Sequence, residues 1–297
     1  MIEEYSVYKD LVEKHLADFL FEGENTNLPL MEAMKYSLTA GGKRLRPVLC
    51  MAACEFVGGK CRDALPFACA IEYIHTYSLI HDDLPCMDDD DLRRGKPTNH
   101  KVFGEGMAVL AGDGLLTTAF EAMSKELMMY FDTPEQFARR ACAMYAIAEA
   151  AGIRGMVAGQ ACDLSYEGRQ GSEETLNFID RNKTAALIKA SVLAGLYIGG
   201  ADPQTRKDLE RYAVALGLAF QVADDILDVT GSEAELGKPV GSDEEKAKTT
   251  SVTVLGLENA KKRLADLTSQ AIDAIAPYYD NAEFFRHIAE QLAVRTS

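Results

Sequence analysis

The chain of 297 residues is 47% hydrophobic, which supplies enough apolar material for the core of one large domain or two small ones. Its 46 acidic residues outnumber its 31 basic residues and give a formal net charge of −15, which argues against a nucleic-acid partner and against attraction to anionic membranes. Seven cysteines, an odd number, argue against a disulfide framework. The first five residues show no basic n-region and no apolar h-region, so we expect no secretory signal. Because no run of about 18 apolar residues is present, we expect a cytoplasmic protein without membrane insertion.

Apolar residues recur at intervals of three and four along nearly the whole chain, which predicts helices. Glycine pairs and prolines separate the helical windows, and no low-complexity linker divides the chain. Only Ser251–Leu255 would pass for a strand. We therefore expect one all-α domain over residues 1–297, a bundle of roughly ten or more helices. The clearest helical windows are Met107–Tyr130, Glu135–Ala151, Thr184–Ile198, Thr205–Val229 and Glu258–Ile275.

The first chemically distinctive segment is basic. Residues Gly41–Pro47 hold three basic side chains within four positions, and Pro47 suits the first position of a helix that runs to about Val57. A helix N-terminus beside lysine and arginine is a suitable cradle for a diphosphate. The alternative is an ordinary solvated basic loop, although bases are scarce in this chain.

The second distinctive segment is acidic: six of the ten residues from Asp82 to Asp91 are aspartates. We expect a helix over Leu65–Asp83, in which His75 and Asp82 share one stripe. Pro85 disfavours continuation, so the chain can turn and bring Asp88 back towards the two preceding aspartates. Converging carboxylates suit Mg²⁺, with phosphate oxygens and water completing its coordination.

Bases follow this acidic segment directly, at Arg93, Arg94 and Lys96, and can hold an anion that the metal also binds. The alternative is a solvated acidic loop neutralised by these arginines. Further along, Lys183 and Thr184 open a long helix and can offer a positive charge and a hydroxyl to a polar site. Asp163 is a possible supporting acid.

A second acidic cluster lies within an otherwise apolar helix. Asp224 and Asp228 are one turn apart, Asp225 lies between them, and Gln221 precedes them on the same side. A solvent-facing polar stripe is the alternative, but its acids have no lysine partner four residues on. Because an unpaired carboxylate is costly in apolar surroundings, the cluster favours a second metal-binding motif, and we expect the two acidic clusters to face each other as an approximate pair.

Together these segments resemble the motifs of the trans-isoprenyl diphosphate synthase family. The spacing Asp82-Asp83-x4-Asp88 with Arg93-Arg94 resembles the first aspartate-rich motif, and Asp224-Asp225-x2-Asp228 resembles the second. Residues Gly42–Pro47 resemble the isopentenyl-diphosphate motif. Their order and separation also match, over most of residues 30–255, and are most similar to those of bacterial-type farnesyl diphosphate synthases.

The resemblance implies an all-α fold around a deep central cavity, a homodimer, and about three Mg²⁺ ions, with Mn²⁺ as a possible substitute. It places isopentenyl diphosphate on Lys43, Arg46, His75 and Arg94. It places the allylic diphosphate on Arg93, Lys183, Thr184, Gln221 and Lys238, with Lys248 helping to close the site. It assigns the metal to Asp82, Asp83, Asp88, Asp224 and Asp228, and adds Asp225 to the catalytic residues.

The implied activity is a prenyl transfer in which the allylic diphosphate ionises, isopentenyl diphosphate attacks the cation, and a proton is lost. The resemblance also implies that product length depends on the residue five positions before the first motif. That residue is Tyr77, about 7.5 Å along the helix from Asp82. Its ring predicts a short cavity and farnesyl diphosphate (C15). Ser78 leaves some room, so geranylgeranyl diphosphate (C20) is the alternative.

Three other classes of protein share some of these features. A terpene cyclase would carry an Asn/Ser/Glu metal set in place of the second motif, and a non-catalytic partner subunit would have lost aspartates from one motif. A di-iron bundle would carry paired Glu-x-x-His signatures. The complete pair of aspartate motifs disfavours all three.

Overall fold

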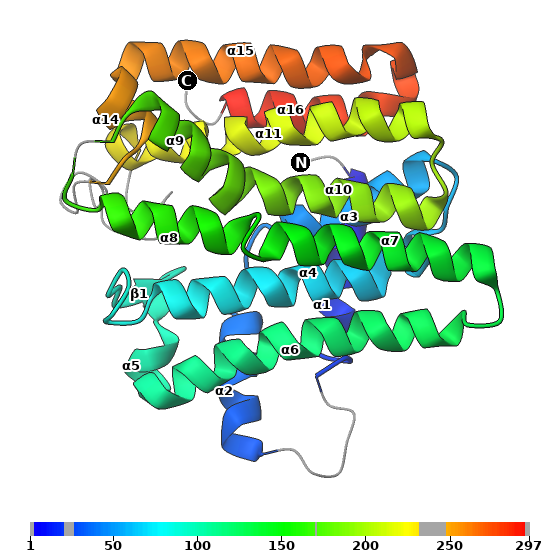
Figure 1. Cartoon of the computed structure of the whole chain (residues 1–297), viewed down its shortest axis with the longest axis horizontal. Helices are drawn as coiled ribbons and strands as arrows, with labels where there is room; N and C mark the ends of the chain where they lie inside the picture. The colour runs from blue at the N-terminus through cyan, green and yellow to red at the C-terminus, as the bar shows by residue number, and fades with distance from the viewer. Residues whose placement is uncertain (1–2, 21–26, 170, 232–247, 295–297) are drawn as a thin grey trace. The chain divides into compact units, whose positions relative to one another are not determined.

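The computed structural model describes residues 3–20, 27–169, 171–231 and 248–294 (Figure 1). They form two compact units: Met1–Met144 with Ala194–Gly200, and Tyr145–Leu193 with Ala201–Ser297. Both units consist of helices, which confirms the predicted all-α class with ten or more helices. A single domain over residues 1–297 stays a prediction.

The first unit is organised around α4 (Cys61–Asp82), which is buried along most of its length. This helix packs against α3 (Leu45–Phe56) and α6 (Glu105–Met129). A short antiparallel hairpin, β1 (Leu92–Arg93) and β2 (Lys96–Pro97), follows α4 and was not expected from the sequence. The unit also contains α1 (Glu3–His15), α2 (Leu28–Leu38), α5 (Asn99–Phe103), the start of α7 (Pro134–Ala151) and the end of α10 (Ala186–Gly199).

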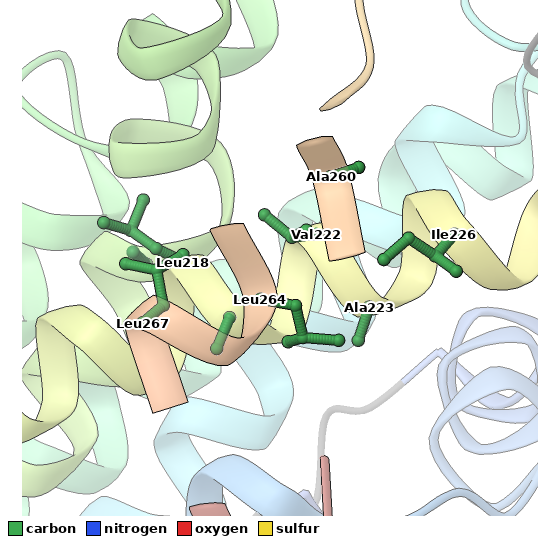
Figure 2. Packing of buried hydrophobic residues seen from close by; sticks show 9 residues of the cluster. Leu218, Val222, Ala223, Ile226, Ala260, Leu264 and Leu267 are labelled. Atoms are coloured by element: carbon green, nitrogen blue, oxygen red, sulfur yellow. The ribbon is translucent and has the colours of Figure 1, made fainter. Parts of the chain in front are cut away.

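The second unit is organised around α11 (Pro203–Thr230), which packs along α15 (Leu257–Ile275). Leucine, valine, isoleucine and alanine side chains from the two helices form a buried cluster, and Figure 2 shows Val222 and Ile226 of α11 beside Ala260 and Leu264 of α15. The remaining elements are α8 (Met156–Tyr166), α9 (Glu173–Ile179), a π-helical turn η1 (Asp180–Ala185), α14 (Ser251–Leu255), a 3-10 helix η2 (Ala276–Ala282) and α16 (Glu283–Val294).

The segment Ser251–Leu255, whose composition would pass for a strand but which is too short to argue from, is the helix α14. Reciprocal capping overrides the β-branched composition here: Thr253 N donates to Thr250 Oγ1 at 3.2 Å, and Thr250 N donates to Thr253 Oγ1 at 2.9 Å. This arrangement satisfies amide groups that the first turn of a helix leaves open.

One stretch of the described residues, Pro134–Tyr166, is by length and composition alone apolar enough to cross a membrane. A non-helical turn at residues 152–155 divides this stretch into α7 and α8, and about a third of its most apolar window is buried inside the protein. The stretch also carries exposed apolar side chains, including Ile153 at 84% exposure.

Candidate active site

The basic loop between α2 and α3 is held in place by Arg44. This residue has a left-handed backbone with φ 56° and is only 3% exposed. Its Nη1 lies 2.5 Å from Glu72 Oε1, its Nε lies 2.8 Å from Glu13 Oε1, and its Nη2 donates to the Leu38 carbonyl at 2.7 Å. Arg44 therefore anchors the loop from inside the protein.

Glycine allows this basic loop to contact the loop that follows β1. Arg94 donates a hydrogen bond to the Gly41 carbonyl, and a Cβ atom on Gly42 would lie 2.8 Å from Arg94 Cζ. Gly42 also has φ 137°, a conformation that disfavours other residues. The guanidinium of Arg94 can therefore lie against the backbone of the loop that carries Lys43 and Arg46.

His75 lies on α4 where these cationic groups gather. Burial lowers the pKa of His75 well below its ordinary value, and the charges of Arg46, Arg94, Arg44 and Arg93 lower this pKa further. The imidazole is therefore neutral, while the arginines around it supply positive charge suited to a diphosphate. Arg46, His75 and Arg94, which the resemblance assigned to one diphosphate, all lie in the first unit, and the charges of both arginines act on His75.

The first acidic cluster adjoins this basic group at the C-terminal end of α4. Asp88 N donates to the Asp82 carbonyl at 2.8 Å, so the predicted turn back of the chain is confirmed. Asp83 is 3% exposed and accepts a hydrogen bond from Arg93 Nε at 2.9 Å. Burial raises the pKa of Asp83, and Arg93 opposes this shift. Asp83 thus holds Arg93, and a metal-ligand role for Asp83 stays a prediction.

The predicted chain-length residues lie on the same helix. Tyr77 is 8% exposed, and both burial and the charge of Asp82 raise its pKa. The Ser78 hydroxyl donates to the His75 carbonyl at 2.9 Å, so it is satisfied by its own helix. The bulky ring of Tyr77 is therefore buried close to the first aspartate of the cluster.

In the second unit, hydrogen bonds connect the predicted polar residues across helices. Thr184 Oγ1 donates to Gln221 Oε1 at 2.6 Å, and Gln221 Nε2 donates to Asp225 Oδ1 at 2.8 Å. The amide of Ser251 donates to the other Asp225 oxygen at 2.7 Å. Residues from η1, α11 and α14 thus form one connected polar group, which fixes Asp225 from both sides.

Lys183 belongs to the same region of this unit. Its Nζ lies 2.5 Å from Asp163 Oδ2 on α8, so the supporting acid suggested by the sequence does pair with this lysine. Lys183 and Thr184 stand in the π-helical turn and not at the start of an α-helix as predicted. Single π-turns within helices occur frequently at functional sites.

The geometry of α11 separates its acids from its core. At 100° per residue, Val222 and Ile226 face α15, while Gln221, Asp224 and Asp228 project on the opposite side. Asp228 is 2% exposed. The apolar packing therefore fixes the rotation of the helix and with it the direction of the acidic cluster.

Sequence reasoning missed several supporting residues. Asp180 is 2% exposed, and burial together with the charge of Asp225 raises its pKa to about 8, although Arg263 lies 3.5 Å away and opposes the shift.

Arg44 and Glu72 were also missed as a pair. A carboxylate at Glu72 within the apolar run of α4 is a signal that could have revealed a buried cation.

Magnesium suits the donors that are present. Within residues 3–20, 27–169, 171–231 and 248–294, no group of three or more Asp, Glu, His or Cys side chains can hold a metal ion by itself. Mg²⁺ is commonly bound by one or two carboxylates, with substrate phosphates and waters as the other ligands. Asp82 and Asp88 in one unit, and Asp224 and Asp228 in the other, offer such carboxylates.

Two further predicted site residues, Lys238 and Lys248, precede α14 in the sequence. Lys248 is half-buried in the loop that leads into this helix. Lys238 lies outside the described residues, so its predicted contact with the allylic diphosphate stays a prediction.

Comparison with known proteins identifies related sequences and structures. The polyprenyl synthetase family matches residues 28–279. Farnesyl diphosphate synthase of Geobacillus stearothermophilus is 52% identical over 236 residues, which cover 80% of this chain and 78% of that protein. Heterodimeric geranylgeranyl pyrophosphate synthase large subunit 1, chloroplastic, of Arabidopsis thaliana is 51% identical over 251 residues, which cover 84% of this chain and 67% of that protein.

A solved structure extends the comparison to the fold. The geranyltransferase of Helicobacter pylori, complexed with magnesium and isoprenyl diphosphate, has a TM-score of 0.84 at 34% identity, and the alignment covers 98% of this chain and 97% of that one. The similarity therefore extends across both compact units.

Proposed function

Because the chain belongs to the polyprenyl synthetase family and is therefore a trans-prenyltransferase, we propose that it condenses isopentenyl diphosphate with dimethylallyl or geranyl diphosphate to give farnesyl diphosphate. The observation that carries this proposal is the group of arginines around His75, directly beside the acidic turn from Asp82 to Asp88. A diphosphate and the cations that accompany it require these two kinds of surface side by side.

The basic group of the first unit binds isopentenyl diphosphate. Lys43, Arg46 and Arg94 supply charge, and neutral His75 supplies one N–H donor. Arg44 keeps the loop in the conformation that presents Lys43 and Arg46. With its diphosphate fixed, the substrate directs its double bond at the reacting carbon, which removes most of the entropic cost of bringing the two molecules together.

The allylic diphosphate is held by Arg93 together with Lys183, Thr184 and Gln221 of the second unit. When bound, Mg²⁺ stabilises the charge that grows on the leaving diphosphate. Asp82, Asp88, Asp224 and Asp228 would hold about three such ions, and the Helicobacter pylori relative with magnesium supports this choice of metal. Mn²⁺ is an expected substitute, since it also accepts oxygen ligands.

The chain's own residues prepare the ionisation step in two ways. Lys183 is oriented by Asp163, and Thr184 by Gln221, so their donors are in place before charge develops on the diphosphate. Apolar helix surfaces exclude water that would otherwise capture the cation. The proton lost after condensation goes to the released diphosphate.

The length of the product follows from Tyr77. Its buried ring beside Asp82 favours a C15 product. Geranylgeranyl diphosphate is the second candidate, because a geranylgeranyl pyrophosphate synthase subunit from Arabidopsis thaliana is as similar to this chain as the farnesyl diphosphate synthase is.

We also propose that the chain forms a homodimer and is located in the cytoplasm. Exposed apolar side chains on α6, Val109 at 39% and Leu110 at 54%, support an interface with a second copy, because such residues gain stability when they are covered. Size-exclusion chromatography with light scattering tests the dimer. A monomer at micromolar concentration would contradict it.

The experiment that tests the function is a product assay. The purified chain is incubated with Mg²⁺, isopentenyl diphosphate and geranyl diphosphate, and the products are separated by chromatography after removal of phosphate. A C15 product that disappears on addition of a chelator is expected. A cyclic hydrocarbon, or no product from any allylic starter, would contradict the proposal.

A further inference from the structure

The ring of Tyr77 does not stand alone on α4. The imidazole of His81, one turn further along the helix, meets it edge to face, with ring centroids 5.6 Å apart and an interplanar angle of 81°. An edge-to-face aromatic pair of this kind favours one orientation of both rings. The position of the Tyr77 ring is therefore coupled to the position of His81.

His81 is fixed in turn by α6. Its Nε2 lies 3.0 Å from the Val109 carbonyl oxygen, and because a carbonyl can only accept, Nε2 carries the hydrogen. The same nitrogen lies 4.0 Å from Asp113 Oδ1. The hydrogen bond to the Val109 carbonyl thus holds the imidazole against α6, with Asp113 one turn further along the same face of this helix.

The space that His81 occupies exists because residue 112 is glycine. A Cβ atom on Gly112 would lie 2.1 Å from His81 Nε2 and 2.5 Å from Cδ2, far inside van der Waals contact. Glycine in the interior of a helix costs about 0.5–1 kcal/mol relative to alanine, so it requires a packing reason. Gly106, near the start of the same helix, has no such neighbour within 4 Å.

We infer that His81 and Gly112 set the length of the product by positioning the Tyr77 ring. Gly112 admits the imidazole, the Val109 carbonyl fixes it, and its edge holds Tyr77. His81 and Gly112 are positioning residues, since they act through Tyr77. The inference rests on the proposed prenyl transfer and on Tyr77 as the residue that limits the chain.

The test compares product ratios of His81→Ala, Tyr77→Ala and the double variant, with Mg²⁺, isopentenyl diphosphate and geranyl diphosphate as substrates. His81→Ala removes the aromatic contact and frees the Tyr77 ring. It should therefore raise the C20-to-C15 ratio by up to about tenfold, which corresponds to the upper end of the free energy of an aromatic pair. Adding His81→Ala to Tyr77→Ala should change nothing further, because the partner ring is already gone. His81→Phe retains a ring edge and should keep the ratio closer to that of the wild type.

Gly112→Ala provides an independent variant in case His81→Ala does not fold. It displaces the imidazole and should shift the ratio in the same direction, whereas the matched control Gly106→Ala should behave as the wild type. The ratio is measured within each reaction, so a general loss of activity near Asp82 does not affect it.

The outcomes separate the inference from the proposed function. If Tyr77→Ala lengthens the products while His81→Ala and Gly112→Ala leave the ratio unchanged or shorten them, the inference is overturned. If the wild type forms no prenyl product at all, the proposed function is overturned instead.

Discussion

The buried guanidinium of Arg44 shows how one residue organises a binding loop in a chain of net charge −15. Desolvating a cation is costly, and here two carboxylates and a backbone carbonyl compensate for it. Lys43 and Arg46 on either side stay closer to solvent. The resemblance assigned only Lys43 and Arg46 to the diphosphate, and the fold shows that Arg44 between them is the anchor of the loop.

Arg44→Met should lower the free energy of unfolding by about 3–5 kcal/mol, because Glu72 is then buried without its cation. The double variant Arg44→Met/Glu72→Leu should recover most of this loss. Urea denaturation measures both values, and the exposed Arg62→Met serves as the control. Equal stability of Arg44→Met and the control would contradict a structural role for the pair.

The lowered pKa of His75 predicts how the free energy of unfolding depends on pH. Its folded-state pKa lies well below about 6.5, so the unfolded chain binds more protons in the window below that value. The contribution of His75 to stability is therefore present above pH ~6.5 and is lost as the pH falls, by at most about 1.4 kcal/mol per pH unit. Calorimetric melting of wild type and His75→Gln at pH 7.0 and 5.5 tests this sign. The variant should lose less stability on acidification, and an equal or larger loss would contradict the prediction.

At the scale of elements, the π-helical turn η1 explains why Lys183 and Thr184 reach the polar group of the second unit. Two glycines allow the neighbouring helices to approach this turn: a Cβ on Gly159 would lie 2.2 Å from Lys183 N, and one on Gly217 would lie 2.6 Å from the Ala185 Cα. The turn is therefore supported from both α8 and α11.

Gly159→Ala should displace this turn and raise the KM for the allylic diphosphate by at least about tenfold, the effect of losing one charge-assisted contact. The KM for isopentenyl diphosphate should change much less, because its binding residues lie in the other unit. Steady-state kinetics with each substrate varied in turn separates these effects, and Gly106→Ala is the control. An equal rise in both KM values would indicate general damage and contradict the prediction.

Most helices could be predicted from periodicity alone. The expected windows Glu258–Ile275 and Thr205–Val229 agree with α15 and α11 to within one or two residues. The turn after Asp82 could be predicted because Pro85 disfavours continuation of the helix. The π-turn, the hairpin after α4 and the helix at Ser251–Leu255 could not be predicted, because side-chain capping and tertiary packing decide them locally.

The candidate site could be predicted as a set of residue types but not as a set of contacts. Asp83 and Arg93 were both expected at the site, but their spacing did not reveal that Arg93 donates a hydrogen bond to Asp83. Glycines marked breaks and one motif in the sequence, but not the close contacts at Gly42, Gly112 and Gly159, each of which admits a neighbouring group that a methyl would exclude. Such contacts depend on the close approach of distant segments, which spacing along one chain does not encode.

At the scale of the whole molecule, the two acidic clusters belong to different compact units, with Asp82–Asp88 in one and Asp224–Asp228 in the other. In the proposed function, both clusters serve one allylic diphosphate through bound magnesium. Catalysis then depends on the intact chain, and neither unit alone should bind the allylic substrate with full affinity.

The most direct measurement is calorimetric titration of an inert allylic thiolodiphosphate in the presence of Mg²⁺. The wild type should bind one equivalent of the analogue per chain with high affinity. Asp82→Ala and Asp224→Ala should each weaken that same site by at least about a hundredfold, since each removes a carboxylate that a shared ion requires. Unchanged affinity in either variant would contradict the claim that both clusters hold the same diphosphate.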